Sequence, residues 1–160
     1  MYLYSLLAAA LAIILLFVVP KRAKVWVATA LISVAAIGAI ALSVLTLVEG
    51  KQELATFTTS LFGTERISVD GISALFLVII SIASIATVLY SRGYVKGYLE
   101  RFTAAHIALH YTALVMLVVS MMLVVVTSGG FSFLFSWELM TIASFILILF
   151  EADRQEVRRA

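Results

Sequence analysis

Glu138 is an acidic residue inside an otherwise apolar segment, in the sequence FLFSWELMT at residues 133–141. The other eight acidic residues lie in polar segments or in the charged tail. An ionisable side chain near the centre of a membrane costs roughly 2.5 to 3.5 kcal/mol, so such residues usually pair, face a cavity or move ions. We therefore predict that Glu138 takes part in proton translocation. The alternative is a protonated carboxyl group that is hydrogen-bonded between helices, for example to Thr141.

Two histidines, His106 and His110, are four positions apart and would share one face of a helix. Imidazole groups can carry protons at neutral pH. At 1.5 Å per residue, His110 would lie about 6 Å inside its apolar segment and about 12 Å short of the depth of Glu138. Both histidines are candidates for a path by which protons reach Glu138. Histidines at a helix end are more commonly hydrogen-bonded to the neighbouring loop or solvated, and this interpretation stays open.

Other reactive constellations are missing from the sequence. The chain has no cysteine, so it can form neither a disulfide nor a thiolate metal site. One membrane carboxylate and two distant histidines do not make a metal-ligand set, and there is no phosphate-binding glycine loop or Ser/His/Asp set. The sequence thus predicts no cofactor, no metal and no catalytic site in this chain, which by itself is not expected to be an enzyme. Its dispersed basic residues also argue against nucleic-acid binding.

The composition indicates an integral membrane protein. Of the 160 residues, 64% are hydrophobic and 12% are charged, and the mean hydropathy is +1.16. A soluble domain is roughly half apolar and about a quarter charged. Apolar runs near the ~20 residues needed to cross a bilayer predict an all-α bundle of five transmembrane helices in a single membrane domain, 1–160. The predicted spans are 3–19, 25–48, 71–90, 106–127 and 132–150.

The polar segments between these spans carry further predictions. Basic residues follow the first span and none precedes it, so we interpret it as an anchor and not as a cleaved signal peptide. The loop 49–70 alternates polar and apolar residues, which favours a short hairpin or surface strand. Asp70 is placed to cap the third span by accepting a backbone N–H hydrogen bond.

The Lys and Arg residues predict an orientation. Nine of the 11 fall in the segments after spans one, three and five, whereas the other side has only Lys51 and Arg66. Cytoplasmic segments carry an excess of Lys and Arg. We therefore expect the N-terminus outside, the loop 49–70 outside and the C-terminus in the cytoplasm.

Three sequence segments resemble a known family. They are SVDGISALF at 68–76, YSRGY at 90–94 and FLFSWELM at 133–140. Together they are similar to the first part of the antiporter-like subunits of respiratory complex I, Mrp-type Na⁺/H⁺ antiporters, energy-converting hydrogenases and formate hydrogenlyases. HIALHY at 106–111 and FILILFE at 145–151 lean towards the hydrogenase-4 component B branch. The Trp137-Glu138 pair is the most specific element of this resemblance.

The resemblance implies a function. Glu138 matches a glutamate on the fifth helix of the family that pairs with a lysine on a later, broken helix and controls proton movement. This implies a subunit of a respiratory or hydrogenase-type complex in a prokaryotic cell (inner) membrane, in which proton or sodium translocation is coupled to a redox reaction. Since the chain stops where the family continues, we expect another subunit to carry the lysine-bearing helices. The alternatives are a component of a Mrp-type cation/proton antiporter and a purely structural assembly subunit.

Overall fold

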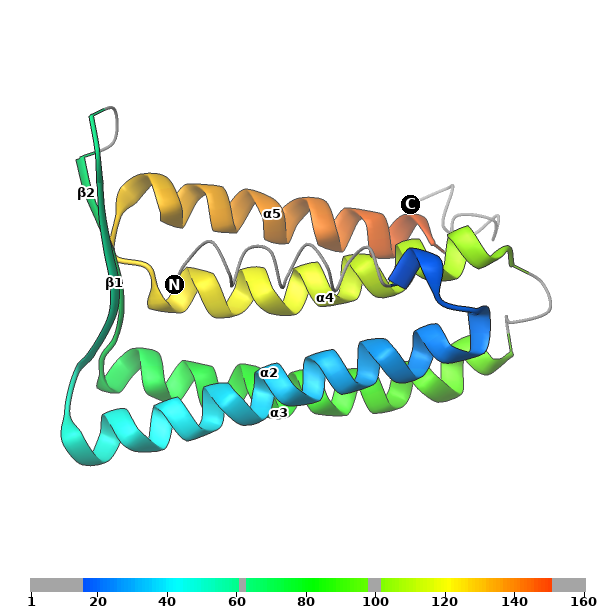
Figure 1. Ribbon diagram of the computed structural model, residues 1–160, viewed down its shortest axis with the longest axis horizontal. Helices are drawn as coiled ribbons and strands as arrows, with labels where there is room; N and C mark the ends of the chain where they lie inside the picture. Colours follow the sequence, from blue (N-terminus) through cyan, green and yellow to red (C-terminus); the bar gives the residue numbers. More distant parts are fainter. Residues whose placement is uncertain (1–15, 61–62, 98–101, 151–160) are drawn as a thin grey trace.

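The computed structural model describes residues 16–60, 63–97 and 102–150, which are mostly helical. Four long helices lie side by side, and a two-stranded hairpin crosses one end of them (Figure 1). The elements in chain order are α2 (Lys21–Glu49), β1 (Gln52–Thr59), β2 (Gly63–Val69), α3 (Gly71–Lys96), α4 (Ala104–Val126) and α5 (Gly130–Leu149). Each of these helices contains a stretch long and apolar enough to cross a membrane. The described fold is that of a multi-pass membrane protein.

The four helices coincide with the second to fifth predicted spans. The predicted first span, 3–19, lies outside the described residues except for 16–19, and the charged tail 151–160 lies outside them entirely. The third helix is longer than its predicted span, because α3 continues from Tyr90 to Lys96. Ser91 and Val95 extend the row of buried positions on α3, so these residues gain tertiary contacts by staying helical. The helix thus continues six residues beyond the end of the predicted span.

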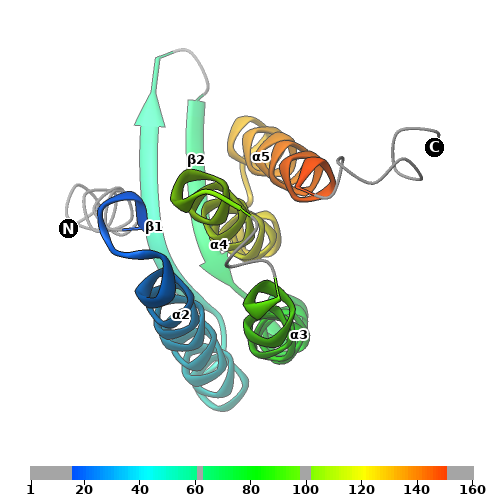
Figure 2. The same ribbon diagram turned by 90° about the vertical axis from the view of Figure 1, so that its right-hand side faces the viewer.

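The main apolar core lies between α2, α3 and α4. On α4, Ile107, Tyr111, Leu114 and Val118 face this core at helical spacing. None of the fully buried members of the core among the described residues comes from α5. Viewed along the bundle, α5 lies at its edge beside α4 (Figure 2). The helix that carries Glu138 is therefore a peripheral element of the described bundle.

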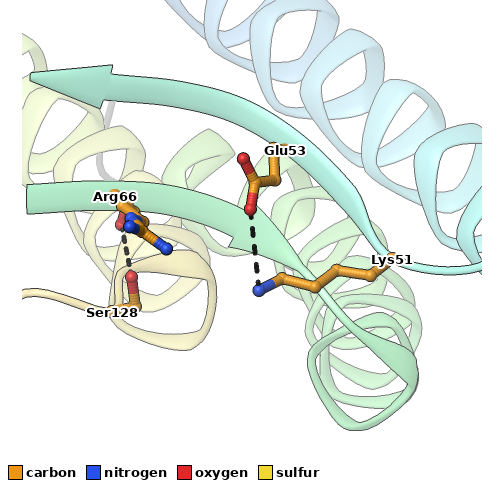
Figure 3. Close-up of polar contacts among 4 residues, drawn as sticks. All are labelled: Lys51, Glu53, Arg66 and Ser128. Carbon is orange, nitrogen blue, oxygen red and sulfur yellow. Dashed lines mark hydrogen bonds and ion pairs between the residues drawn. The ribbon is translucent and has the colours of Figure 1, made fainter.

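The loop 49–70 forms the predicted hairpin. β1 and β2 are antiparallel, with Gln52 opposite Val69 and Thr59 opposite Gly63. An exposed ion pair joins Lys51 Nζ to a Glu53 carboxylate oxygen at 3.9 Å, at the start of the hairpin (Figure 3). The bundle is thus not purely helical, since a small sheet covers one end.

Asp70 caps α3 as predicted. Its Oδ1 accepts a hydrogen bond from the Ser73 backbone N–H at 2.8 Å. The hydrogen bonds from Ser73 favour the charged carboxylate and hold the pKa of Asp70 below its usual value. This contribution to stability is present above the pKa of an unfolded aspartate and is lost as the pH falls through the lower folded pKa.

The described basic residues divide between the two ends of the bundle. Lys51 and Arg66 belong to the hairpin region, whereas Lys21, Lys24, Arg92 and Lys96 lie towards the opposite end. There the Arg92 guanidinium lies 3.9 Å from the centre of the Trp26 ring, which joins α3 to α2. Aromatic and basic residues are typical of helix ends at a membrane interface. Which end faces the cytoplasm stays a prediction.

Candidate functional site

Glu138 lies near the middle of α5. The helix has 20 residues, which gives about 30 Å at 1.5 Å per residue and matches the hydrocarbon thickness of a bilayer. Glu138 is the ninth residue of the helix, so its Cα lies about 2 Å from the helix midpoint along the axis. A helix that crosses the membrane with this length places Glu138 close to the bilayer centre.

The Glu138 side chain is exposed on a side of α5 that the described bundle leaves uncovered. Residues three, four or seven positions apart on a helix lie on the same side. We call this side the outer face of α5, consisting of Leu134, Glu138, Ile142 and Phe145. Leu134 and Phe145 are each 58% exposed, whereas Ser136 and Ala143 are buried. Glu138 is thus an acidic residue in the middle of an exposed apolar stripe.

Within the described part of the chain, the Glu138 carboxylate has no hydrogen-bond or ion-pair partner. The sequence analysis named Thr141 as an alternative hydrogen-bond partner for Glu138. In the structure the Thr141 hydroxyl donates to the Trp137 backbone oxygen at 3.2 Å. The basic residues of the described helices lie near the helix ends, at Lys21, Arg22 and Lys24 of α2 and at Arg92 and Lys96 of α3. A counter-charge for Glu138 at mid-helix must therefore come from outside the described bundle.

His110 belongs to a polar and aromatic cluster near the start of α4. Its Nε2 lies 3.3 Å from the Ser91 hydroxyl oxygen. The same hydroxyl donates to the Tyr111 hydroxyl at 3.4 Å, and Tyr111 donates to the Ser91 backbone oxygen at 3.4 Å. The His110 ring centre lies 4.4 Å from that of Phe150. Its Nδ1 is buried without a hydrogen-bond partner among the residues that the structure describes.

His106 lies on the exposed side of the same helix end. Its ring stacks on Phe102 with centres 5.0 Å apart, and its centre lies 6.0 Å from that of Phe150. The two histidines thus meet the same phenylalanine at the end of α5. Both remain candidates for a proton path, and both have the loop and aromatic contacts expected of structural histidines.

The structure does not bring the histidines to Glu138. Phe150, which contacts both histidine rings, is twelve residues beyond Glu138, a separation of about 18 Å along the helix. The buried Ser84 and Thr112 hydroxyls also lack a hydrogen-bond partner among the described residues. No chain of described hydrogen bonds links the two regions, so the predicted proton path is not formed by these residues alone.

Glu65 is a residue whose position the sequence analysis missed. It was counted among the acids of polar segments, yet its side chain is only 3% exposed. A Glu65 carboxylate oxygen accepts a hydrogen bond from the Ser132 backbone N–H at 3.2 Å, in the first turn of α5. Gly129, the N-cap residue of that helix, provides no side-chain cap. A helix that begins after Ser-Gly-Gly has no side chain at its N-cap glycine to accept hydrogen bonds from its first backbone N–H groups. This missing acceptor was the signal in the sequence for a cap supplied by another segment.

Lys24 is the second missed residue. It was assigned to a cluster of basic residues after the first span, but its side chain is 1% exposed. Its Nζ donates to the backbone oxygens of Leu16 and Phe17, the latter at 3.0 Å. These oxygens belong to the last helical residues before Pro20. Lys24 thus satisfies the carbonyl groups at a helix end that have no partner within their own helix.

No protein-family model matches the chain, and no curated protein matches it at a significant level. In the described residues, no group of three or more His, Cys, Asp or Glu side chains is placed to hold a metal ion. The position of Glu138 and the sequence motifs are therefore the features of this chain that bear on its function.

Proposed function

We propose that this chain is a subunit of a multi-subunit membrane complex and that Glu138 contributes to ion translocation at its contact with another subunit. The observation that supports the proposal is an exposed glutamate, without a partner among the described residues, near the midpoint of an apolar helix about as long as the bilayer core is thick. If the outer face of α5 met lipid, burying this group would cost roughly 2.5 to 3.5 kcal/mol. A neighbouring subunit with a basic or polar group removes that cost.

The sequence motifs support a more specific form of the proposal. The Trp137-Glu138 pair resembles the antiporter-like subunits, in which the glutamate works with a lysine of a later helix. We therefore propose that the complex is of the respiratory or energy-converting hydrogenase type, in a prokaryotic cell membrane, and that it moves protons or sodium ions in response to a redox reaction. The lysine-bearing helices belong to a partner subunit. His106 and His110 would supply protons only through polar groups or water contributed at that contact.

Purification of the native complex tests this proposal. A tagged copy of the full chain should co-purify, in a stoichiometric complex, with larger membrane subunits and with redox subunits that contain iron–sulfur or nickel-iron centres. Membrane partners without redox subunits would favour a Mrp-type cation/proton antiporter. A chain that remains alone or only self-associates in a mild detergent would contradict the proposal.

A further inference from the structure

The hairpin is joined directly to the turn between α4 and α5. Ile67 of β2 pairs with Thr127 in an isolated antiparallel bridge. The backbone N–H and the hydroxyl of Ser128 both donate to the Arg66 backbone oxygen, at 2.9 and 3.0 Å (Figure 3). The turn thus continues the sheet as a short third segment. Through this contact the hairpin fixes the point at which α5 begins.

Glu65 extends this contact into the first turn of α5. Successive side chains of a strand point to opposite faces, and on β2 Glu65 is buried whereas Arg66 is exposed. The buried carboxylate meets the positive end of the α5 helix dipole and accepts the Ser132 N–H. It supplies from the hairpin the cap that the glycine start of α5 lacks.

Gly129 provides the space for this carboxylate. A Cβ atom at Gly129 would overlap with the Glu65 carboxylate group, although the backbone of Gly129 is extended and unstrained. A Cβ atom at the adjacent Gly130 would meet nothing within 4 Å. The two glycines therefore have different roles, and only Gly129 is required for the approach of Glu65.

α5 also packs along α4, and at its C-terminal end Phe150 contacts the Phe102, His106 and His110 rings. Within the helix its buried residues are the small Ser136 and Ala143, and among the described residues it supplies no fully buried residue to the main core between α2, α3 and α4. Burial of such small side chains contributes little to stability. The Glu65 contact acts at the N-terminal end of α5, about 30 Å along the helix from the Phe150 contacts.

We propose that Glu65 and Gly129 form a latch by which the hairpin sets the position of α5, with Glu65 as the positioning residue. A helix rises 1.5 Å per residue, so a slip of α5 by one residue would change the depth of Glu138 by about that amount. The consequence for ion translocation rests on the function proposed above. The latch itself does not, because it is defined by contacts within this chain.

A double-mutant cycle on the full chain in lipid nanodiscs tests the latch. Gly129→Ala should lower the melting temperature by about 3 °C or more, as expected for the loss of a helix cap in a chain of this size. Gly130→Ala, the matched control, should not lower it. In a Glu65→Ala background, Gly129→Ala should add no further loss, because the obstructing carboxylate is gone. Equal effects of Gly129→Ala in both backgrounds would overturn the proposal.

The same cycle still tests the latch if the Gly129→Ala variant does not fold. The double variant Glu65→Ala/Gly129→Ala should then recover folded protein, and failure of this double variant would count against the latch. Glu53→Ala on β1, whose side chain is 58% exposed, serves as the hairpin control and should behave like the wild type.

The position of α5 can be measured separately with spin labels, since the natural sequence has no cysteine. Labels at Thr56→Cys on the hairpin and Ile148→Cys on α5 occupy exposed positions. We expect one narrow distance distribution in the wild type and in Glu65→Gln, whose amide oxygen can still accept the hydrogen bond. Glu65→Ala should broaden or shift it. An unchanged distribution in Glu65→Ala would overturn the latch, whatever the result of any transport assay.

Discussion

Replacing Glu138 with glutamine in the assembled complex should lower coupled proton or sodium translocation by about tenfold or more, since groups that transfer protons commonly contribute about 10²- to 10⁴-fold to a rate. Glutamine has nearly the same shape but cannot bind and release a proton or carry a charge. The complex should still assemble, because the outer face of α5 keeps its shape. The measurement is ion uptake into proteoliposomes that contain the purified complex, normalised to the amount of complex.

Three comparison variants separate transport from assembly. Glu138→Asp retains an acidic group and should keep a substantial part of the activity, while Glu53→Gln changes an exposed acid of the hairpin and should leave transport unchanged. Glu138→Ala tests the structural alternative. If Glu138→Ala reduces the yield of complex but not the transport per complex, and Glu138→Gln transports at the wild-type rate, the residue has an assembly role only.

Replacing Lys24 with methionine should destabilise the bundle strongly. The Lys24 ammonium group donates to the backbone oxygens of Leu16 and Phe17, and the side chain is 1% exposed. Methionine fills a similar volume but leaves both oxygens without this donor. A buried polar group without a partner costs about 1–3 kcal/mol, so the loss of two such bonds should lower the melting temperature by several degrees.

The matched control for Lys24 is Lys51→Met. Lys51 has an exposed side chain, and its Nζ lies 3.9 Å from the Glu53 carboxylate oxygen. Replacing Lys51 with methionine should therefore change the melting temperature little. Thermal unfolding of both variants in the same nanodiscs provides the comparison. A Lys24→Met protein with the same melting temperature as Lys51→Met would show that Lys24 does not hold α2 to the helix end at Leu16 and Phe17.

Local patterns in the sequence predicted much of the fold. The hydropathy of residues 71–90, the alternation in 49–70 and the position of Asp70 before an apolar run each depend on residues close in the chain, and the structure contains the corresponding helix, hairpin and cap. The continuation of α3 beyond the predicted span to Lys96 was not predicted, because the burial of Val95 depends on packing against other helices. That packing leaves no signal in the local composition.

The long-range polar contacts were not predictable in the same way. Glu65 lies 67 residues before Ser132, and Lys24 reaches back across Pro20 to helix-end oxygens. Both look like solvated charges when only their neighbours in the sequence are considered. Glu138 could be identified from the sequence alone, because it is an acidic residue inside an apolar segment. The side of α5 that it occupies could not, because it depends on how that helix packs on α4.

We propose that a second membrane subunit covers the outer face of α5 and provides a charge partner for Glu138. A residue-resolution structure of the native complex in nanodiscs tests it most directly. We expect a helix of another subunit against Leu134, Glu138 and Phe145, with a Lys or Arg nitrogen within about 4 Å of the Glu138 carboxylate. Lipid acyl chains packed along that face, with Glu138 pointing into them, would contradict it.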